Sequence, residues 1–329
     1  MLFISVILRT FAIAMKYETL WRRLTGIYDT DEAKAVVRWM LDVGFGLSLT
    51  DIVCGKLDEL SEEKSTMLEG MMQRLEAGEP VQYVVGKAEF SGRMFHVEPG
   101  VLIPRPETGE LCEWIIASDR HGLTRTDDSA AEKTVRESPS LSDANVLDVG
   151  TGSGCIAITL ALEMAEANVT AWDVSEKALS IAKKNAEALG AEVAFEKHDI
   201  LDYSLFLRPF GSKRAELERT IHYSLPFWDV IVSNPPYVCE REKATMERHV
   251  LEHEPHLALF VPDDDPLKFY KAIAQYAKEA LKPNGLLYFE LNPLYACETE
   301  VMVRDLGFTE TEIRQDMFGK QRFLKAKKI

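Results

Sequence analysis

The stretch NVLDVGTGSG, residues 145–154, joins an apolar strand pattern to three closely spaced glycines. Val146, Leu147 and Val149 suit a buried strand, and the glycines suit a turn that opens a helix. Glycines there let backbone N–H groups approach a ligand beside a helix N-terminus, although a tight packing turn is the alternative. The spacing G-x-G-x-G, with Asp148 two residues before it, departs from the dinucleotide fingerprint G-x-G-x-x-G. The stretch predicts a strand, a ligand-binding turn and a helix.

The alternation of strand and helix continues to the end of the chain. Seven strands are predicted, at residues 145–149, 169–172, 192–195, 229–233, 286–291, 309–315 and 321–327. Helices are predicted between them, from about Ile156 to Leu162, from the capping Ser175 to Gly190 and from about Pro266 to Leu281. This pattern is typical of an α/β fold, a doubly wound, Rossmann-like parallel sheet that binds ligands at the carboxyl ends of its strands.

Two carboxylates are predicted at such ends. Asp173 closes the second strand, and Asp199 follows the third. A carboxylate at the position of Asp173 can accept hydrogen bonds from both hydroxyls of a ribose. Together with the glycine turn, Asp173 and Asp199 therefore predict a nucleoside pocket.

The fourth strand ends abruptly in Asn234-Pro235-Pro236-Tyr237. Prolines stop strand pairing and restrict the residue before them, so the motif is a rigid corner. A plain turn is one interpretation. The other interpretation is catalytic. The Asn234 oxygen and the Pro235 carbonyl can accept both N–H groups of a planar amide and hold its poorly nucleophilic nitrogen towards an electrophilic methyl group. Tyr237 can pack on the plane of the amide. Beside a nucleoside pocket, the catalytic interpretation is favoured, with no assigned base.

The N-terminal part predicts separate structures. Residues 1–15 are interpreted as an extra tail, because their apolar run is too short to span a membrane and lacks the basic segment of a signal peptide. Residues 16–80 predict a helical bundle whose helices are capped at Asp29 and Ser61. Residues 81–108 are rich in β-forming residues and predict a β-hairpin connector.

The remaining residues, 109–329, predict one larger domain. It starts with a helix to about Ser118, followed by the polar segment 119–144, which predicts a mobile loop. A second long loop is predicted at 203–226.

Composition limits the classes of function. The chain has 329 residues, of which 46% are apolar and 28% charged, and this suits a globular protein of two domains. Its net charge of −15 argues against sequence-independent nucleic-acid binding, which depends on clustered Lys and Arg. The five cysteines are scattered without a CxxC pair, which favours reduced thiols in a cytoplasmic protein over disulfides or a zinc site.

A group of histidines and glutamates resembles a metal cluster at helical spacing: His249, Glu252, His253, Glu254 and His256. Pro255 interrupts the helix that this spacing would need. We therefore predict surface or structural roles for these residues and no metal.

Taken together, the motifs resemble a known family. DVGTGSG, Asp173 and NPPY are similar to those of class I S-adenosylmethionine-dependent methyltransferases. PVQYVVG (80–86), VLIPRPET (101–108), NPPYV and EHEPHLALF (252–260) resemble the HemK/PrmC group, protein-(glutamine-N5) methyltransferases that modify peptide-chain release factors. The resemblance covers about residues 17–329.

The resemblance implies a class I fold and methyl transfer from S-adenosylmethionine to the side-chain nitrogen of a release-factor glutamine, which tunes translation termination. It implies that the helical domain recognises the substrate, without membrane or direct nucleic-acid binding. The implied cofactor-binding residues are Gly150, Thr151, Gly152, Ser153, Gly154, Asp173, Asp199, Ile200 and Asn234. The implied catalytic residues are Asn234, Pro235 and Tyr237, and Pro236 joins them in binding substrate. Ile200 departs from the Trp that is common in the family.

Other functions stay open at this point. Within the family, ribosomal protein L3 is a possible substrate. A flipped nucleic-acid base presents the same planar NH2 group, although the acidic charge argues against it. A non-catalytic binding module or a nicotinamide dehydrogenase is disfavoured by the glycine spacing and by NPPY.

Overall fold

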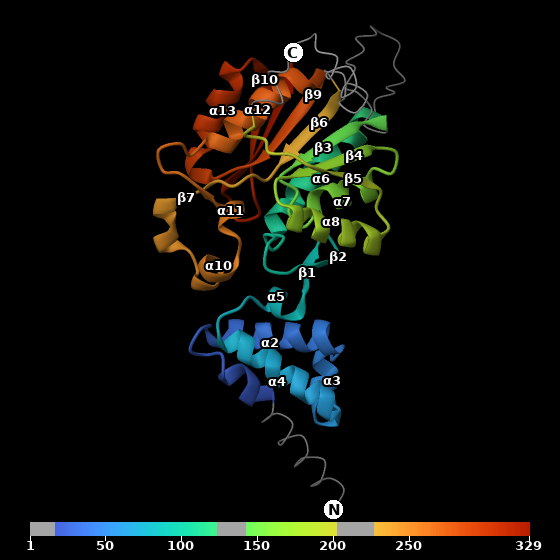
Figure 1. The fold of residues 1–329 in the computed structure, drawn as a ribbon, viewed down its shortest axis with the longest axis vertical. Helices are drawn as coiled ribbons and strands as arrows, with labels where there is room; N and C mark the ends of the chain where they lie inside the picture. The colour runs from blue at the N-terminus through green and yellow to red at the C-terminus, as the bar shows by residue number, and fades with distance from the viewer. Residues whose placement is uncertain (1–16, 124–142, 203–226) are drawn as a thin grey trace, which may run out of the picture. The chain divides into compact units, whose positions relative to one another are not determined.

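The computed structural model describes residues 17–123, 143–202 and 227–329. They form two compact units (Figure 1). The first contains the described part of Met1–Ala88 together with Val97–Pro99 and Met246–Glu254. The second contains Glu89–His96 and the described parts of Gly100–Thr245 and Pro255–Ile329. The predicted tail, the loop at 203–226 and most of the loop at 119–144 lie outside the described residues. None of the described helices has the length and hydropathy that crossing a membrane requires.

The first unit is helical. Its elements are α2 (Thr30–Phe45), α3 (Leu49–Cys54), η1 (Lys56–Glu59), α4 (Glu62–Glu76), α5 (Val81–Val85) and α10 (Arg248–His253). Asp29 caps α2 by accepting the N–H groups of Asp31 and Glu32, and Ser61 caps α4. Leu24, Met40 and Met72 are among its fully buried side chains. The helical prediction for this part of the chain and both caps are confirmed.

The predicted β character of residues 81–108 is wrong at its start. Val81–Val85 is the helix α5, between Pro80 at its N-cap and a left-handed Gly86. Val81 and Val84 are buried in the helical core, and this packing overrides the β preference of valine. A hairpin does follow, with β1 (Lys87–Phe90) and β2 (Arg93–His96) in a two-stranded sheet.

The second unit is built on a sheet of seven strands, as predicted, and the order of the strands in it is β10-β11-β9-β6-β3-β4-β5. Its strands are β3 (Asn145–Val149), β4 (Asn168–Asp173), β5 (Val193–Lys197), β6 (Trp228–Ser233), β9 (Leu281–Glu290), β10 (Phe308–Gln315) and β11 (Gln321–Lys328). Strands β9, β6, β3, β4 and β5 are parallel, as predicted. Strand β11 runs antiparallel to β9 and β10 antiparallel to β11, so the prediction of a parallel sheet is wrong for these last two strands. β9 starts earlier than predicted, directly after the preceding helix.

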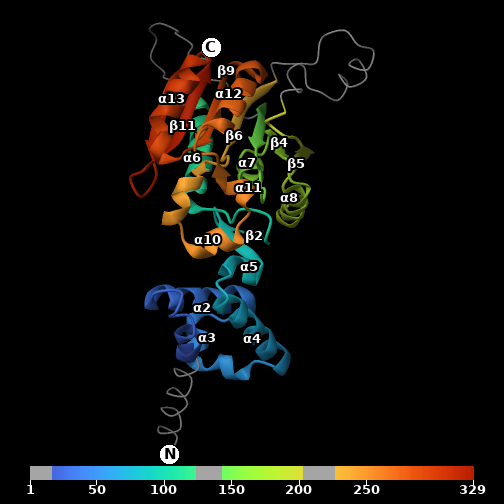
Figure 2. The same cartoon turned by 60° about the vertical axis from the view of Figure 1, so that its left-hand side comes forward.

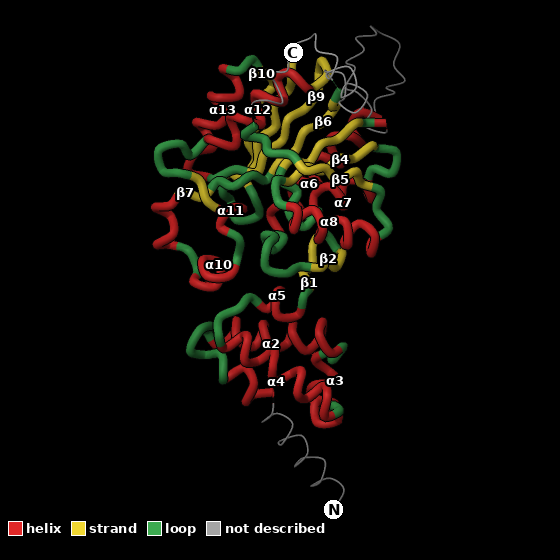
Figure 3. Tube along the Cα trace, in the orientation of Figure 1, coloured by secondary structure: helices red, strands yellow, loops and turns green. Residues whose placement is uncertain are grey.

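Helices cover both faces of this sheet (Figures 2 and 3). They are α6 (Pro106–Leu123), α7 (Cys155–Glu163), α8 (Glu176–Leu189), α12 (Lys268–Ala280) and α13 (Ala296–Asp305). Val146 packs in the core that contains α6 and α7, and its neighbour Leu147 packs in the core that contains α12 and α13. This alternation is what a strand buried on both faces requires. Helix α6 reaches Leu123, so the predicted loop at 119–144 begins too early.

Short elements complete the second unit after β6. They are β7 (Val238–Cys239), η4 (Glu240–Thr245), α11 (His256–Leu259), β8 (Phe260–Val261) and η5 (Pro293–Tyr295). Pro255 precedes α11, so α10 and α11 are separate helices, as the proline predicts. Strand β3 pairs with β4 on one side and with β6 on the other. The order of connection reverses there, and such a switch point opens a crevice at the carboxyl ends of the strands.

Candidate active site

A cavity of about 340 Å³ lies at this crevice, and residues of the second unit line it. Its walls come from the turn after β3 (residues 150–153), from Asp173 at the end of β4, from Asp199 and Ile200 after β5, and from Asn234 after β6. The volume falls within the range of small-molecule sites. The cavity thus brings together all the predicted cofactor-binding residues except Gly154.

Asp148 shapes the glycine turn from beneath. It is completely buried, and its Oδ2 accepts hydrogen bonds from the Thr151 hydroxyl at 2.7 Å and from the Ala157 N–H at 3.2 Å. Its Oδ1 has no partner among the described residues. Burial raises the pKa of Asp148 to about 7. Because Asp148 does not line the cavity, it acts on the turn rather than on a ligand.

The glycines of this turn have two different roles. Gly150 (φ 77°) and Gly152 (φ 56°) line the cavity, and a Cβ on either would meet no atom within 4 Å. At Gly154 (φ 84°), a Cβ would lie 2.8 Å from Ile158 Cδ1 and 3.0 Å from Ala182 Cβ. Gly154 therefore lets α7 and α8 pack closely, whereas Gly150 and Gly152 leave room for a ligand.

Asp173 connects two parts of the cavity wall. Its Oδ2 accepts the N–H of Gly152 at 2.9 Å, and its Oδ1 accepts the N–H of Ser175 at 2.8 Å. Burial raises the pKa of Asp173, and these backbone hydrogen bonds oppose the rise. Each carboxylate oxygen keeps a further acceptor position. Asp173 can therefore hold the turn and still accept hydroxyls of a ligand.

Two aromatic residues of the cavity wall were missed by the sequence analysis. The ring centroids of Trp172 and His198 lie 4.3 Å apart, and both residues line the cavity. Glu196 Oε2 accepts the Trp172 indole N–H at 3.1 Å and lies 3.0 Å from His198 Nε2. Their positions beside Asp173 and Asp199 are the only sequence signal for them. Next to this pair, the buried Ile200 adds an apolar surface.

The NPPY corner forms another wall. Asn234, Pro235 and Pro236 line the cavity, and Asn234 Nδ2 donates to the Thr108 hydroxyl at 3.1 Å. Among the described residues, no donor to Asn234 Oδ1 is found, so this oxygen is available to a ligand. Tyr237 is not part of the cavity lining, and its hydroxyl donates to Glu290 Oε1 at 3.1 Å. Its contact with a substrate amide stays a prediction.

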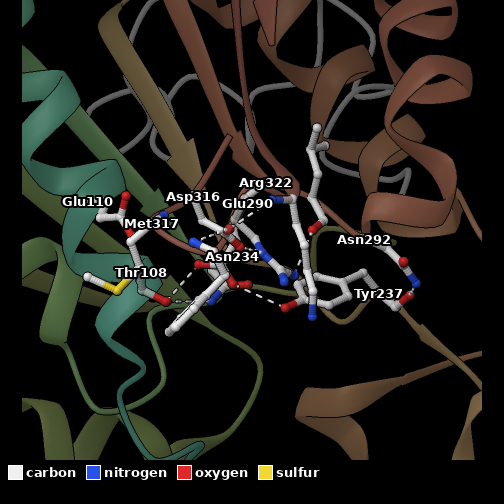
Figure 4. A network of polar contacts seen from close by, with 12 residues as sticks. Thr108, Glu110, Asn234, Tyr237, Glu290, Asn292, Asp316, Met317 and Arg322 are labelled. Carbon is white, nitrogen blue, oxygen red and sulfur yellow. Dashed lines mark hydrogen bonds and ion pairs between the residues drawn. The ribbon is translucent and has the colours of Figure 1, made fainter. Parts of the chain in front are cut away.

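A buried polar network supports this corner (Figure 4). Glu290 is the last residue of β9, and its Oε2 accepts the Thr108 hydroxyl at 2.6 Å. Asn292 Nδ2 donates to the Tyr237 carbonyl at 3.0 Å. The roles of Thr108 and Glu290 escaped the sequence analysis. The sequence signal for Glu290 is its position as a charged residue at the end of the otherwise apolar strand LLYFE.

The arrangement suits catalysis by alignment of a bound substrate rather than catalysis by a nucleophilic side chain. It offers a ligand-sized cavity with the carboxylate of Asp173 at one wall and, at another, Asn234, whose amide nitrogen is bound to Thr108. Within the described ranges, no group of three His, Cys, Asp or Glu residues could hold a metal ion. Fixed acceptors of this kind can orient an NH2 group towards an electrophile.

Comparisons with known proteins find family models, relatives and solved structures that are similar to this chain. A family model described as a methyltransferase domain matches residues 140–291, and one described as the PrmC N-terminal domain matches residues 21–86. The release factor glutamine methyltransferase of Bacteroides thetaiotaomicron is 42% identical, over 92% of this chain and 95% of that protein. The protein of the same name from Bacillus subtilis is 34% identical, over 84% and 85%. A solved methyltransferase from Pyrococcus furiosus covers 82% of this chain and 99% of its own at a TM-score of 0.44 and 15% identity.

Proposed function

The chain belongs to the release factor glutamine methyltransferases, and on that premise we propose that its cavity binds S-adenosylmethionine and that Asn234 orients a glutamine side chain beside it. The chain is a class I methyltransferase that transfers a methyl group to the amide nitrogen of a glutamine in peptide-chain release factors. Which residues of this chain hold the cofactor and the glutamine is our proposal.

The cavity suits the cofactor. Asp173 has acceptor positions left for the two ribose hydroxyls, and the open space at Gly150 and Gly152 lets the backbone approach a ligand. Asp199 and the apolar Ile200 would flank the adenine. Bound there, S-adenosylmethionine supplies a methyl group made electrophilic by its sulfonium.

The NPPY corner would hold the glutamine amide. Its nitrogen is a poor nucleophile because the lone pair is delocalised into the carbonyl. Asn234 Oδ1 and the Pro235 carbonyl accept the two N–H groups and direct the nitrogen to the methyl. The prolines keep both acceptors in place, so alignment and fixed dipoles supply most of the catalysis.

One observation carries this proposal. Asn234 gives its NH2 group to Thr108 at 3.1 Å and thereby keeps its oxygen as an acceptor at the cavity wall. An oxygen in that place binds a donor such as an amide NH2. With the amide reversed, two NH2 groups would face each other, and the substrate would be repelled.

The helical first unit is proposed to recognise the protein substrate. The cavity is lined by residues of the second unit, which leaves the first unit free for partner binding. The net charge of −15 favours a protein partner over nucleic acid.

A labelling experiment tests the function. The chain is given S-adenosylmethionine with a labelled methyl group and, separately, a purified release factor, ribosomal protein L3 and DNA. We expect label on the release factor, on one glutamine by mass spectrometry, and none after that glutamine is changed to alanine. Preferred labelling of the ribosomal protein or of DNA would overturn the assignment.

A further inference from the structure

We propose that Glu290 is a positioning residue, which fixes the orientation of the Asn234 amide through the hydroxyl of Thr108 and anchors the same corner through Tyr237. The inference rests on the proposed function, because it concerns how the NPPY corner is made ready for a substrate amide.

The geometry shows a continuous chain of hydrogen bonds (Figure 4). Asn234 Nδ2 donates to Thr108 Oγ1 at 3.1 Å, and Thr108 Oγ1 donates to Glu290 Oε2 at 2.6 Å. Thr108 and Glu290 are each 2% exposed, so water does not compete with the protein for these bonds. Asn234 directly follows β6, Thr108 lies in the first turn of α6 and Glu290 ends β9, so this chain of hydrogen bonds ties three elements together.

The direction of this chain decides which way the Asn234 amide faces. A threonine hydroxyl has one proton and two acceptor positions. Because that proton goes to the carboxylate of Glu290, Thr108 can only accept from Asn234. Asn234 must then turn its NH2 group to Thr108 and its oxygen to the cavity. Without the carboxylate, Thr108 could donate to the Asn234 oxygen and stabilise the reversed amide, which presents NH2 to the substrate.

Glu290 also acts on the other end of the corner. Its Oε1 accepts the Tyr237 hydroxyl at 3.1 Å, and its own carbonyl accepts the Tyr270 hydroxyl at 3.1 Å. One carboxylate thus holds the first and last residues of NPPY, the first through Thr108. A shift of the NPPY corner would break the hydrogen bond from Tyr237 to Glu290 and the link from Asn234 to Glu290 through Thr108. We therefore expect the motif to be held rigidly to β9.

The ionised form of Glu290 is the one that orients Asn234. Burial raises the pKa of Glu290 above its ordinary value of 4.5, although the hydrogen bonds of Thr108 and Tyr237 and the charge of Arg322 oppose the rise. The other titratable groups that face it are Glu107, Tyr270, Cys112 and Cys155. A protonated Glu290 would donate a hydrogen bond and release the Thr108 proton towards Asn234. Methyl transfer should therefore fall as the pH is lowered through the pKa of Glu290.

The test compares Thr108→Val, Thr108→Ser and Glu290→Gln with the wild type in single-turnover methyl transfer to a release factor. Valine has the shape of threonine without its hydroxyl, and serine keeps the hydroxyl. We expect Thr108→Val and Glu290→Gln to lower the rate about tenfold to a hundredfold, as for a misplaced catalytic group. Thr108→Ser should stay close to the wild type. Glu290→Gln should also lose the fall in rate at low pH, which a purely structural residue would not control.

Controls separate positioning from general damage. Cofactor affinity by calorimetry should be unchanged in all variants. Glu113→Gln removes an exposed carboxylate from the same helix, five residues after Thr108, and should not alter the rate. If Glu290→Gln does not fold, the comparison of Thr108→Val with Thr108→Ser still tests the inference. A wild-type rate in Thr108→Val would overturn this inference alone, whereas a wild-type chain that transfers no methyl to the release factor would overturn the proposed function and the inference together.

Discussion

Asp173 accepts a hydrogen bond from the backbone N–H of Gly152 at 2.9 Å, so the carboxylate at the end of β4 holds the glycine turn that follows β3. The two motifs that indicated a nucleoside pocket are therefore one structural unit. A change at Asp173 should act on a ligand directly, through lost acceptors, and indirectly, through the turn.

Asp173→Ala should weaken binding of S-adenosylmethionine by about 2–3 kcal/mol, because it removes charge-assisted hydrogen bonds to the ribose. Calorimetry measures the affinity. Glu176→Ala, which removes an exposed carboxylate at the start of the following helix, serves as the control with the same change of charge. Equal affinities in wild type and a folded Asp173→Ala would refute the ribose assignment.

Asn234→Ala should leave the fold and cofactor binding nearly intact and lower the rate of methyl transfer. Removing one positioned hydrogen-bonding group from such a site raises the barrier by about 2.7–4 kcal/mol, or about a hundredfold to a thousandfold in rate. Asn234→Asp keeps the acceptors but loses the donor to Thr108, so its rate should lie between those of wild type and alanine. Single-turnover assays with a release factor give these rates. Full activity of Asn234→Ala would mean that NPPY is only a turn.

Two alanine substitutions in the glycine turn should have different effects. Gly154→Ala should destabilise the fold by about 1–3 kcal/mol, because its Cβ would collide with Ile158 and Ala182. Gly150→Ala would meet no protein atom within 4 Å, so apart from backbone strain its main effect should be on cofactor affinity. Urea unfolding and calorimetry measure the two quantities. The distinction fails if Gly154→Ala unfolds at the same urea concentration as the wild type.

Asp148 should make stability depend on pH. Burial raises its pKa to about 7 in the folded state, against about 3.9 in the unfolded chain. The folded state therefore binds a proton more tightly, so the contribution of Asp148 to stability is present below about pH 4 and lost as the pH rises to about 7. The loss is at most about 1.4 kcal/mol per pH unit in that window.

Comparing wild type with Asp148→Asn isolates this contribution, because asparagine does not titrate. The free energy of unfolding of both proteins is measured with urea at several pH values. Between pH 4 and 7, the wild type should lose stability relative to Asp148→Asn. A difference that stays constant over this range would contradict the raised pKa.

Much of the fold could be predicted because its signals are local. The strand at 145–149 follows from its apolar residues, and the caps at Asp29, Ser61 and Ser175 follow from the short reach of their side chains. Helix α5 could not be predicted in this way. Its valines favour strands, and their burial in the helical core decides against that preference.

By itself, the sequence determined the sheet, the glycine turn, Asp173 and the NPPY corner, because each depends on backbone geometry and on residues a few positions apart. Only the tertiary structure decided how the corner is supported. Thr108 and Glu290 are 182 positions apart, and Asn234 and Thr108 are 126 apart. No local pattern records such a pairing, because the packing of α6 against β9 and the pairing of β9 with β6 bring these side chains together. Burial then makes their hydrogen bonds obligatory.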